Sequence, residues 1–243
     1  MTATAIVTGA SRGFGRAVSA ELCGTGMRVV GVARNPADLD EVRESLGENF
    51  IAVRGDATEP GLAERLIEEH APTVMVLCAG AMPSMRPLHQ HTWESFSRNW
   101  HADVRHVFEW VGAALRHPLA PGASVIALSS GAALRGSPLS GGYAGAKTTI
   151  RFVTSYAAEE SQRAGLGISF VSLLPQLTPL TDLGAAAVAA YADAAGVDVD
   201  THVASMGDVV TPELVGRSVT NLAGASSKPG AYALTAAGLR PLD

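Results

Sequence analysis

The chain has 243 residues, of which 47% are hydrophobic and 17% are charged, a composition that excludes a disordered chain. This length suits one α/β domain over residues 1–243. The formal net charge is −5 and lysine and arginine form no cluster, which argues against nucleic acid and membrane surfaces as partners. The N-terminal segment lacks the pattern of a signal peptide, and two cysteines are too few for a disulfide framework, so we expect a cytoplasmic protein.

Short apolar runs alternate with longer amphipathic segments along the chain. The apolar runs predict strands at residues 4–8, 28–33, 50–53, 74–77, 123–128, 168–173 and 232–234. The amphipathic segments predict helices at residues 13–23, 37–46, 59–70, 93–116, 142–163 and 182–195. This alternation predicts an α/β fold, in which a doubly wound, Rossmann-type parallel sheet of about seven strands carries helices on both faces.

One segment, residues 178–207, interrupts this alternation. It is rich in alanine and follows the sixth predicted strand, where a lid over a ligand would be inserted. We therefore expect a substrate lid at about 178–207. Its apolar side chains favour a bulky or hydrophobic substrate, and they are Leu180, Leu183, Val188, Tyr191 and Val197.

A glycine-rich turn follows the first predicted strand and opens the first predicted helix. Its glycines have the spacing G-x-x-x-G-x-G, which is typical of a turn that approaches a pyrophosphate and directs a helix N-terminus at its charge. The alternative is an ordinary glycine-rich turn between a strand and a helix. The residues of this turn that we expect to bind a cofactor are Gly9, Ser11, Arg12, Gly13, Phe14 and Gly15.

The end of the second predicted strand indicates which dinucleotide is preferred. Folds that prefer NAD place an acidic residue about 20 residues after the glycine turn, where it binds the ribose 2′-hydroxyl. Here Ala33 and Arg34 follow, without a carboxylate, and an arginine can bind a 2′-phosphate. Arg12 can approach the same phosphate. We therefore predict NADP(H) as the cofactor; the alternative is that both arginines are solvated surface charges.

Three polar residues have the spacing of a catalytic site. Tyr143 and Lys147 are four residues apart and share one face of a helix, and Ser130 follows the fifth predicted strand, thirteen residues before the tyrosine. An isolated tyrosine has a pKa of about 10 and is a poor acid–base catalyst at neutral pH, but a nearby ammonium favours its phenolate. A serine hydroxyl can hold a substrate oxygen within reach of that tyrosine.

The glycine turn, Ser130 and the segment Tyr143-Ala-Gly-Ala-Lys147 together resemble the short-chain dehydrogenase/reductase family. The similarity extends over nearly the whole chain, from the first predicted strand to Tyr232. It implies strand order 3-2-1-4-5-6-7 and a nicotinamide cofactor. It also implies that Tyr143 is the general acid/base, that Ser130 orients the reacting carbonyl, and that Lys147 binds the nicotinamide ribose.

The same resemblance assigns further residues to the cofactor and shows where this sequence departs from the family. Asp56 and Ala57 match the segment beside the adenine ring, and Ala79 and Gly80 match the end of an Asn-Ala-Gly turn beside the ribose. Three departures concern residues that we still expect in the site. Cys78 stands where the family has asparagine, Asp103 stands at the position of a catalytic asparagine, and Pro175 is followed by glutamine instead of glycine.

Asp103 has two interpretations. It lies near Lys147 and strengthens the positive charge of the lysine, or it is a charged residue on a solvent-facing helix surface. In the first case it also opposes formation of a tyrosinate. The two effects on Tyr143 act in opposite directions, and the sequence does not determine the direction of the net effect.

The leading function hypothesis is an NADP(H)-dependent oxidoreductase that moves a hydride between the nicotinamide and a small-molecule carbonyl or alcohol. A first alternative is an NADP-binding member of the same fold that acts as a sensor without catalysis. A second is an isomerase or dehydratase that uses the same tyrosine.

Histidines at short spacings raise the question of a metal site, and the pairs are His89 with His91 and His101 with His106. Neither pair belongs to a known metal-binding spacing, so we expect no metal. His89 or His91 lines the substrate pocket or lies in a surface loop.

Five aromatic residues lie in the long helix predicted at 93–116. We expect Phe96 and Trp100 to face the sheet, whereas Trp93 and Trp110 lie either in an interface or in the core. The family resemblance and the low charge content predict a homodimer or homotetramer.

Overall fold

An eight-stranded sheet forms the centre of the protein. The computed structural model describes residues 2–224 and 230–242. The strand order is β3-β2-β1-β4-β5-β6-β7-β8, and the pairs from β3 to β7 are parallel. The bounds are β1 Thr4–Thr8, β2 Arg28–Ala33, β3 Phe50–Arg54, β4 Val74–Leu77, β5 Ser124–Leu128, β6 Ser169–Pro175, β7 Gly230–Thr235 and β8 Gly238–Leu242. The predicted α/β fold with a doubly wound parallel sheet is confirmed.

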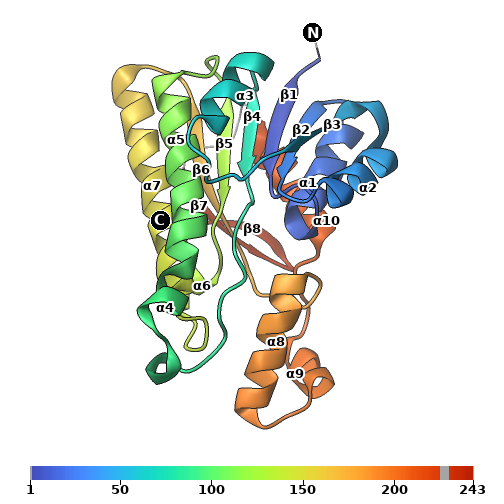
Figure 1. Ribbon diagram of the computed structural model, residues 1–243, viewed down its shortest axis with the longest axis vertical. Helices are drawn as coiled ribbons and strands as arrows, with labels where there is room; N and C mark the ends of the chain where they lie inside the picture. The colour runs from blue at the N-terminus through green and yellow to red at the C-terminus, as the bar shows by residue number, and fades with distance from the viewer. Residues whose placement is uncertain (1, 225–229, 243) are drawn as a thin grey trace.

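Helices cover both faces of the sheet (Figure 1). One face packs on α1 (Gly13–Gly24), α2 (Pro36–Leu46) and α10 (Pro212–Ala223). The other packs on α3 (Leu62–His70), α5 (Arg105–Arg116) and α7 (Tyr143–Ala164). Because both faces are covered, the central strands are apolar on both sides, and this explains why they appear as continuous apolar runs in the sequence.

The strand order reverses at β1, which pairs with β2 on one side and with β4 on the other. Connections that leave in opposite directions from this point separate at the carboxyl ends of the strands, where α/β proteins bind their ligands. The segments that follow β1, β2, β4, β5 and β6 are therefore brought together at one edge of the sheet.

The eighth strand lies outside the prediction of about seven strands. β8 pairs antiparallel with β7 through a tight connection between Thr235 and Gly238. It contains glycine and Pro241, which are depleted in strands, so its sequence carries little strand signal. An edge strand tolerates both, because only one of its sides pairs with a neighbour.

The single helix predicted at 93–116 is wrong as a continuous α-helix. The structure has α4 (Trp93–Asn99), a π-helical turn η3 (Trp100–Val104) and then α5. A capping box of Thr92 and Ser95 starts α4. The wider π turn changes the rotation of the side chains along the segment, and such turns are frequent at functional sites.

The aromatic residues of this segment are distributed differently from the prediction. Trp110 lies in the core, where its indole N–H donates to the Ala57 carbonyl at 2.9 Å, so the interface interpretation does not hold for it. Trp93 is 77% exposed. Trp100, which we expected to face the sheet, is 40% exposed and lies against the start of α7 at Gly142.

Residues 178–207 form two helices, α8 (Asp182–Ala195) and α9 (Val199–Met206), of which α9 was not predicted. Figure 1 shows both beyond the carboxyl ends of the strands. Of the apolar residues expected in the lid, Val188 is buried within the fold, whereas Leu180 and Val197 are exposed. In the described residues, no helix combines the length and the apolar character that a membrane span requires.

Candidate active site

One cleft of about 960 Å³ opens at the carboxyl ends of the strands. It brings together segments from distant parts of the chain, as the reversal of strand order requires. All the residues predicted for the site line it: Gly9, Ser11, Arg12, Gly13, Phe14, Gly15, Arg34, Asp56, Ala57, Cys78, Ala79, Gly80, Asp103, Ser130, Tyr143, Lys147 and Pro175.

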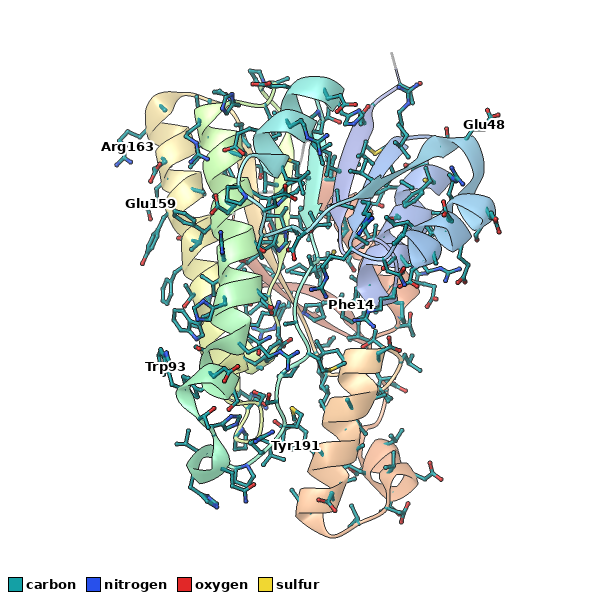
Figure 2. All side chains as sticks on the ribbon, in the orientation of Figure 1. Phe14, Glu48, Trp93, Glu159, Arg163 and Tyr191 are labelled. Atoms are coloured by element: carbon teal, nitrogen blue, oxygen red, sulfur yellow. The ribbon has the colours of Figure 1, made fainter. Side chains whose placement is uncertain are left out.

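The glycine turn has the geometry that a pyrophosphate requires. Gly9 has φ +68°, and a Cβ atom there would lie 2.9 Å from the Ala79 backbone. A Cβ on Gly15 would lie 2.1 Å from the Gly9 carbonyl oxygen. The side chain of the N-cap residue Arg12 makes no capping hydrogen bond to α1, which suits a helix N-terminus that binds an anion. Figure 2 shows Phe14 projecting from the start of this helix. These features fit a dinucleotide.

The two arginines expected near a 2′-phosphate have different surroundings. Arg34 follows β2 and lines the cleft. Arg12 forms an ion pair with Asp182 at 3.3 Å, which joins the glycine turn to the start of α8. Both partners are largely exposed, so this pair contributes little and a bound anion can displace it. Asp38 also lines this end and accepts a hydrogen bond from Asn35.

Asp56 is held in a fixed orientation beside Arg34. Its Oδ1 accepts hydrogen bonds from the backbone N–H and the hydroxyl of Thr58, at 2.9 and 2.8 Å. The backbone hydrogen bond is the largest contribution that lowers the pKa of Asp56, and the positive charge of Arg34 adds to it. The carboxylate is therefore ionised at neutral pH.

Lys147 and Tyr143 project from the first two turns of α7 towards the end of β5. The ammonium of Lys147 donates to the Leu128 carbonyl at 3.1 Å and lies 5.6 Å from the centre of the Tyr143 ring. Ser129 anchors the helix by donating to the Lys147 carbonyl at 2.8 Å. Ser130 accepts a hydrogen bond from the Ala132 N–H at 3.2 Å and lines the cleft with the tyrosine.

Asp103 forms a buried ion pair with Lys147. Its Oδ2 lies 3.2 Å from the lysine Nζ, and its Oδ1 accepts a hydrogen bond from the Ala81 N–H at 2.8 Å. Asp103 is 1% exposed, so the solvent-facing interpretation is wrong. Burial by itself lowers the pKa of Lys147, but the negative charge of Asp103, with smaller contributions from neighbouring groups, outweighs it and raises that pKa. The lysine therefore stays protonated.

Comparison with known proteins decides the family. Residues 3–192 match the short chain dehydrogenase family. The chain belongs to this family. It is 28% identical over 179 residues to the L-xylulose reductase of Bos taurus, and the match covers 72% of each chain. It is 29% identical over 176 residues to the hydroxynaphthalene reductase arp2 of Aspergillus fumigatus, covering 69% of this chain and 64% of the relative.

A third relative is the D-erythrulose reductase of Gallus gallus, 28% identical over 159 residues, with 64% of each chain covered. The protein is accordingly an oxidoreductase of the short-chain dehydrogenase family, which uses a nicotinamide cofactor.

Two buried polar residues of this short-chain dehydrogenase were not predicted as site residues from the sequence. Asn99 is buried and donates to the Ala81 carbonyl at 2.8 Å and to Asp103 at 3.4 Å. His106 is buried, lines the cleft and lies 3.0 Å from the Thr8 hydroxyl. Asn99 lies four residues before Asp103, and His106 lies three residues after it. Such positions share a helix face, so this spacing is the signal that could have identified both residues.

Thr8 connects His106 to the cofactor side of the cleft. Its hydroxyl oxygen also accepts from the backbone N–H groups of Cys78 and Ala79, at 3.1 and 3.3 Å. Burial and the positive charge of Lys147 lower the pKa of His106 to about 3, so the imidazole is neutral. Desolvation raises the pKa of the Cys78 thiol to about 12. Lys147 and Asp103 therefore form a charged pair, whereas the neighbouring His106 and Cys78 are neutral.

Neither His89 nor His91 lines the cleft, so the substrate-pocket interpretation of these residues is wrong. His91 instead bonds with Ser95 and with the Arg86 carbonyl, at 3.0 and 3.2 Å. Across residues 2–224 and 230–242, no group of three histidine, cysteine, aspartate or glutamate side chains is arranged to hold a metal ion.

We predict that Asp103→Asn moves the pH dependence of kcat/KM and leaves cofactor affinity nearly unchanged. Asparagine keeps an oxygen for the Ala81 N–H, but the variant loses the negative charge that opposes a tyrosinate. It also loses the charge that keeps the buried Lys147 protonated, so two opposing effects act on Tyr143. The measurement is a pH profile of kcat/KM together with a cofactor titration.

Asp193→Asn, which changes an exposed aspartate of α8, is the matched control and should leave the profile in place. Profiles that superimpose for Asp103→Asn and the unmodified protein would contradict the prediction.

Proposed function

We propose that the protein is an NADP(H)-dependent oxidoreductase that interconverts a carbonyl compound and an alcohol, with Tyr143 as general acid/base. The observation that carries this proposal is the position of Tyr143, Ser130 and Lys147 in the same cleft as the glycine turn. We also propose a cytoplasmic location, supported by two cysteines that remain free thiols.

Each residue of the site has a distinct task in the reduction. The bound nicotinamide supplies or accepts the hydride. Ser130 holds the carbonyl oxygen of the substrate, and Tyr143 donates its phenolic proton to that oxygen as negative charge develops there. In alcohol oxidation the same tyrosine removes the hydroxyl proton.

The ammonium of Lys147 stabilises the phenolate that remains after proton donation. Asp103 keeps the lysine protonated and in place, and also compensates part of its charge. Paired with Asp103, the lysine stabilises the phenolate less, but it is held in place and permanently charged. Such a lysine is suited to binding the nicotinamide ribose as well.

The choice of NADP(H) over NAD(H) is supported by the end of β2. Arg34 lines the cleft there, and in the described residues no ion pair engages its side chain. A guanidinium binds a phosphate through two parallel, charge-assisted hydrogen bonds. Asp38, the nearest acidic residue along the chain, accepts a hydrogen bond from the Asn35 side chain.

Arg34→Ala should weaken NADPH binding by about 1.5–3 kcal/mol and leave NADH binding nearly unchanged, because only NADPH carries the 2′-phosphate. Titration of each cofactor by fluorescence measures both affinities. Arg43→Ala, an exposed arginine on α2 that does not line the cleft, is the control. Equal affinity of the unmodified protein for the two cofactors would refute the preference.

The ion pair also favours a second candidate, an NADP-binding protein without turnover. Asp103 compensates the charge that would activate the tyrosine, so the cleft can hold a dinucleotide while the tyrosine stays inactive. An isomerase or dehydratase that uses Tyr143 is the remaining alternative. A tyrosine variant separates binding from catalysis and so distinguishes these functions.

We predict that Tyr143→Phe lowers turnover by about 10²–10⁴-fold and keeps cofactor affinity, because it removes only the proton donor. The assay is NADPH oxidation with a panel of ketones and aldehydes, with a cofactor titration in parallel. Tyr156→Phe, an exposed tyrosine of α7, should leave turnover unchanged. Cofactor binding without turnover of any carbonyl by the unmodified protein would favour the non-catalytic candidate.

We propose that the protein is a homodimer or homotetramer that associates through α4, α5 and α7. Large apolar side chains are exposed on these helices, and Phe152 stacks on Tyr156 with ring centres 6.2 Å apart. Figure 2 shows Trp93 projecting outward from α4. Exposed apolar surface of this kind marks interaction sites.

Sedimentation should therefore show a species larger than the 25.0 kDa monomer at micromolar concentration. Phe108→Glu, which places a charge at a residue that is 61% exposed on α5, should dissociate it. Glu48→Lys, on the opposite side of the molecule in Figure 2, should not. A monomer at this concentration would refute the proposal.

A further inference from the structure

Arg135 is a charged residue of the cleft to which the proposed reaction gives no task. It ends the short helix α6 (Ala132–Arg135), which begins directly after Ser130 and Gly131. Its side chain is exposed, and within residues 2–224 and 230–242 no acidic side chain forms an ion pair with it. Lys147, the cation beside Tyr143, is compensated by Asp103.

Hydrogen bonds connect the backbone of α6 to Ser130 and to α7. Ser130 accepts from the first amide of α6, and the Gly136 N–H closes the helix by donating to the Ala132 carbonyl at 2.8 Å. Thr148 of α7 donates to the Ala133 carbonyl at 3.2 Å. The arginine is therefore attached to the same framework that carries Ser130 and Tyr143.

The wall opposite α6 comes from α8. Tyr191 of that helix forms a hydrogen bond with the hydroxyl of Ser137, two residues beyond Arg135. Figure 2 shows Tyr191 in the space between α8 and the side of the molecule that carries α4 and α6. The two hydroxyls are neutral, so they add hydrogen-bonding capacity beside the arginine without compensating its charge.

The lining of the cleft also includes apolar side chains, among them Met82, Leu177 and Leu183. A guanidinium that forms no ion pair with the protein is open to a substrate anion. Its planar fork matches the two oxygens of a carboxylate.

We propose that the substrate is an oxo acid, a carbonyl compound whose carboxylate binds Arg135. This inference rests on the proposed reductase function. The carbonyl group lies between Ser130 and Tyr143, the carbon skeleton contacts the apolar lining, and the carboxylate reaches the guanidinium at the end of α6. Arg135 is then a specificity-determining residue, and the proton chemistry remains with Tyr143.

The test compares oxo acids with their uncharged esters. The probes are pyruvate, acetoacetate, levulinate, 5-oxohexanoate and 6-oxoheptanoate, each with its methyl ester, so that the series varies the spacing between carbonyl and carboxylate. We expect at least one acid to have a kcat/KM about 10- to 100-fold above that of its ester, mainly through KM. Arg135→Ala should remove this preference by slowing the acid alone, and Arg135→Lys should restore part of it.

A binding measurement separates this inference from the proposed function. In the NADPH complex of the Tyr143→Phe protein, calorimetry should show that the same acid binds with an affinity about 10-fold or more above that of its ester. Adding the Arg135→Ala change should abolish this difference in affinity. Arg163→Ala, an exposed arginine at the far end of α7 in Figure 2, is the matched control and should retain it.

The outcomes are distinct. Turnover of acids and esters with equal kcat/KM would overturn the role of Arg135 and leave the reductase proposal standing. Selective binding of acids that depends on Arg135, without turnover in the unmodified protein, would support the anion site and refute the reductase proposal. Absence of both selective binding and selective turnover across the series would identify Arg135 as a solvated surface charge.

Discussion

The buried ion pair between Lys147 and Asp103 is the interaction on which the geometry of the site depends. Lys147 is 6% exposed, and an ammonium removed from water to this extent is strongly destabilising without a partner. Asp103 supplies the opposite charge, and the Lys147 ammonium also donates to the Leu128 carbonyl. The pair therefore fixes the start of α7 against the end of β5 and against the π-helical turn η3.

The requirements of this pair extend through the surrounding segments. The carboxylate of Asp103 also receives the Ala81 N–H, so the segment after β4 takes its position from the same residue. Asn99 completes the arrangement from the preceding helical turn. The neighbouring residues are neutral, because the His106 imidazole carries no charge and the Cys78 thiol keeps its proton. A second charge at this point would disturb the balance that holds the lysine protonated.

The charged side chains of the cleft come from several segments. Arg34 follows β2, Lys147 is paired with Asp103, and Arg135 ends α6; all three line the cleft. Of the apolar side chains expected in a lid, Val188 packs inside the fold, and Arg135 and the hydroxyls of Ser137 and Tyr191 line the cleft.

The sequence by itself determined the class of the fold and the glycine turn that lines the cleft. Strands covered on both faces must be apolar throughout, and a phosphate-binding turn needs glycines at positions where a Cβ would clash, so both features are local and appear directly in the residues. The tertiary structure alone decided that Asp103 pairs with Lys147, that the helix at 93–116 contains a π turn, and that Trp110 is buried. These outcomes depend on contacts between segments far apart in the chain. A helical periodicity shows which residues share a face, but only packing determines what that face contacts.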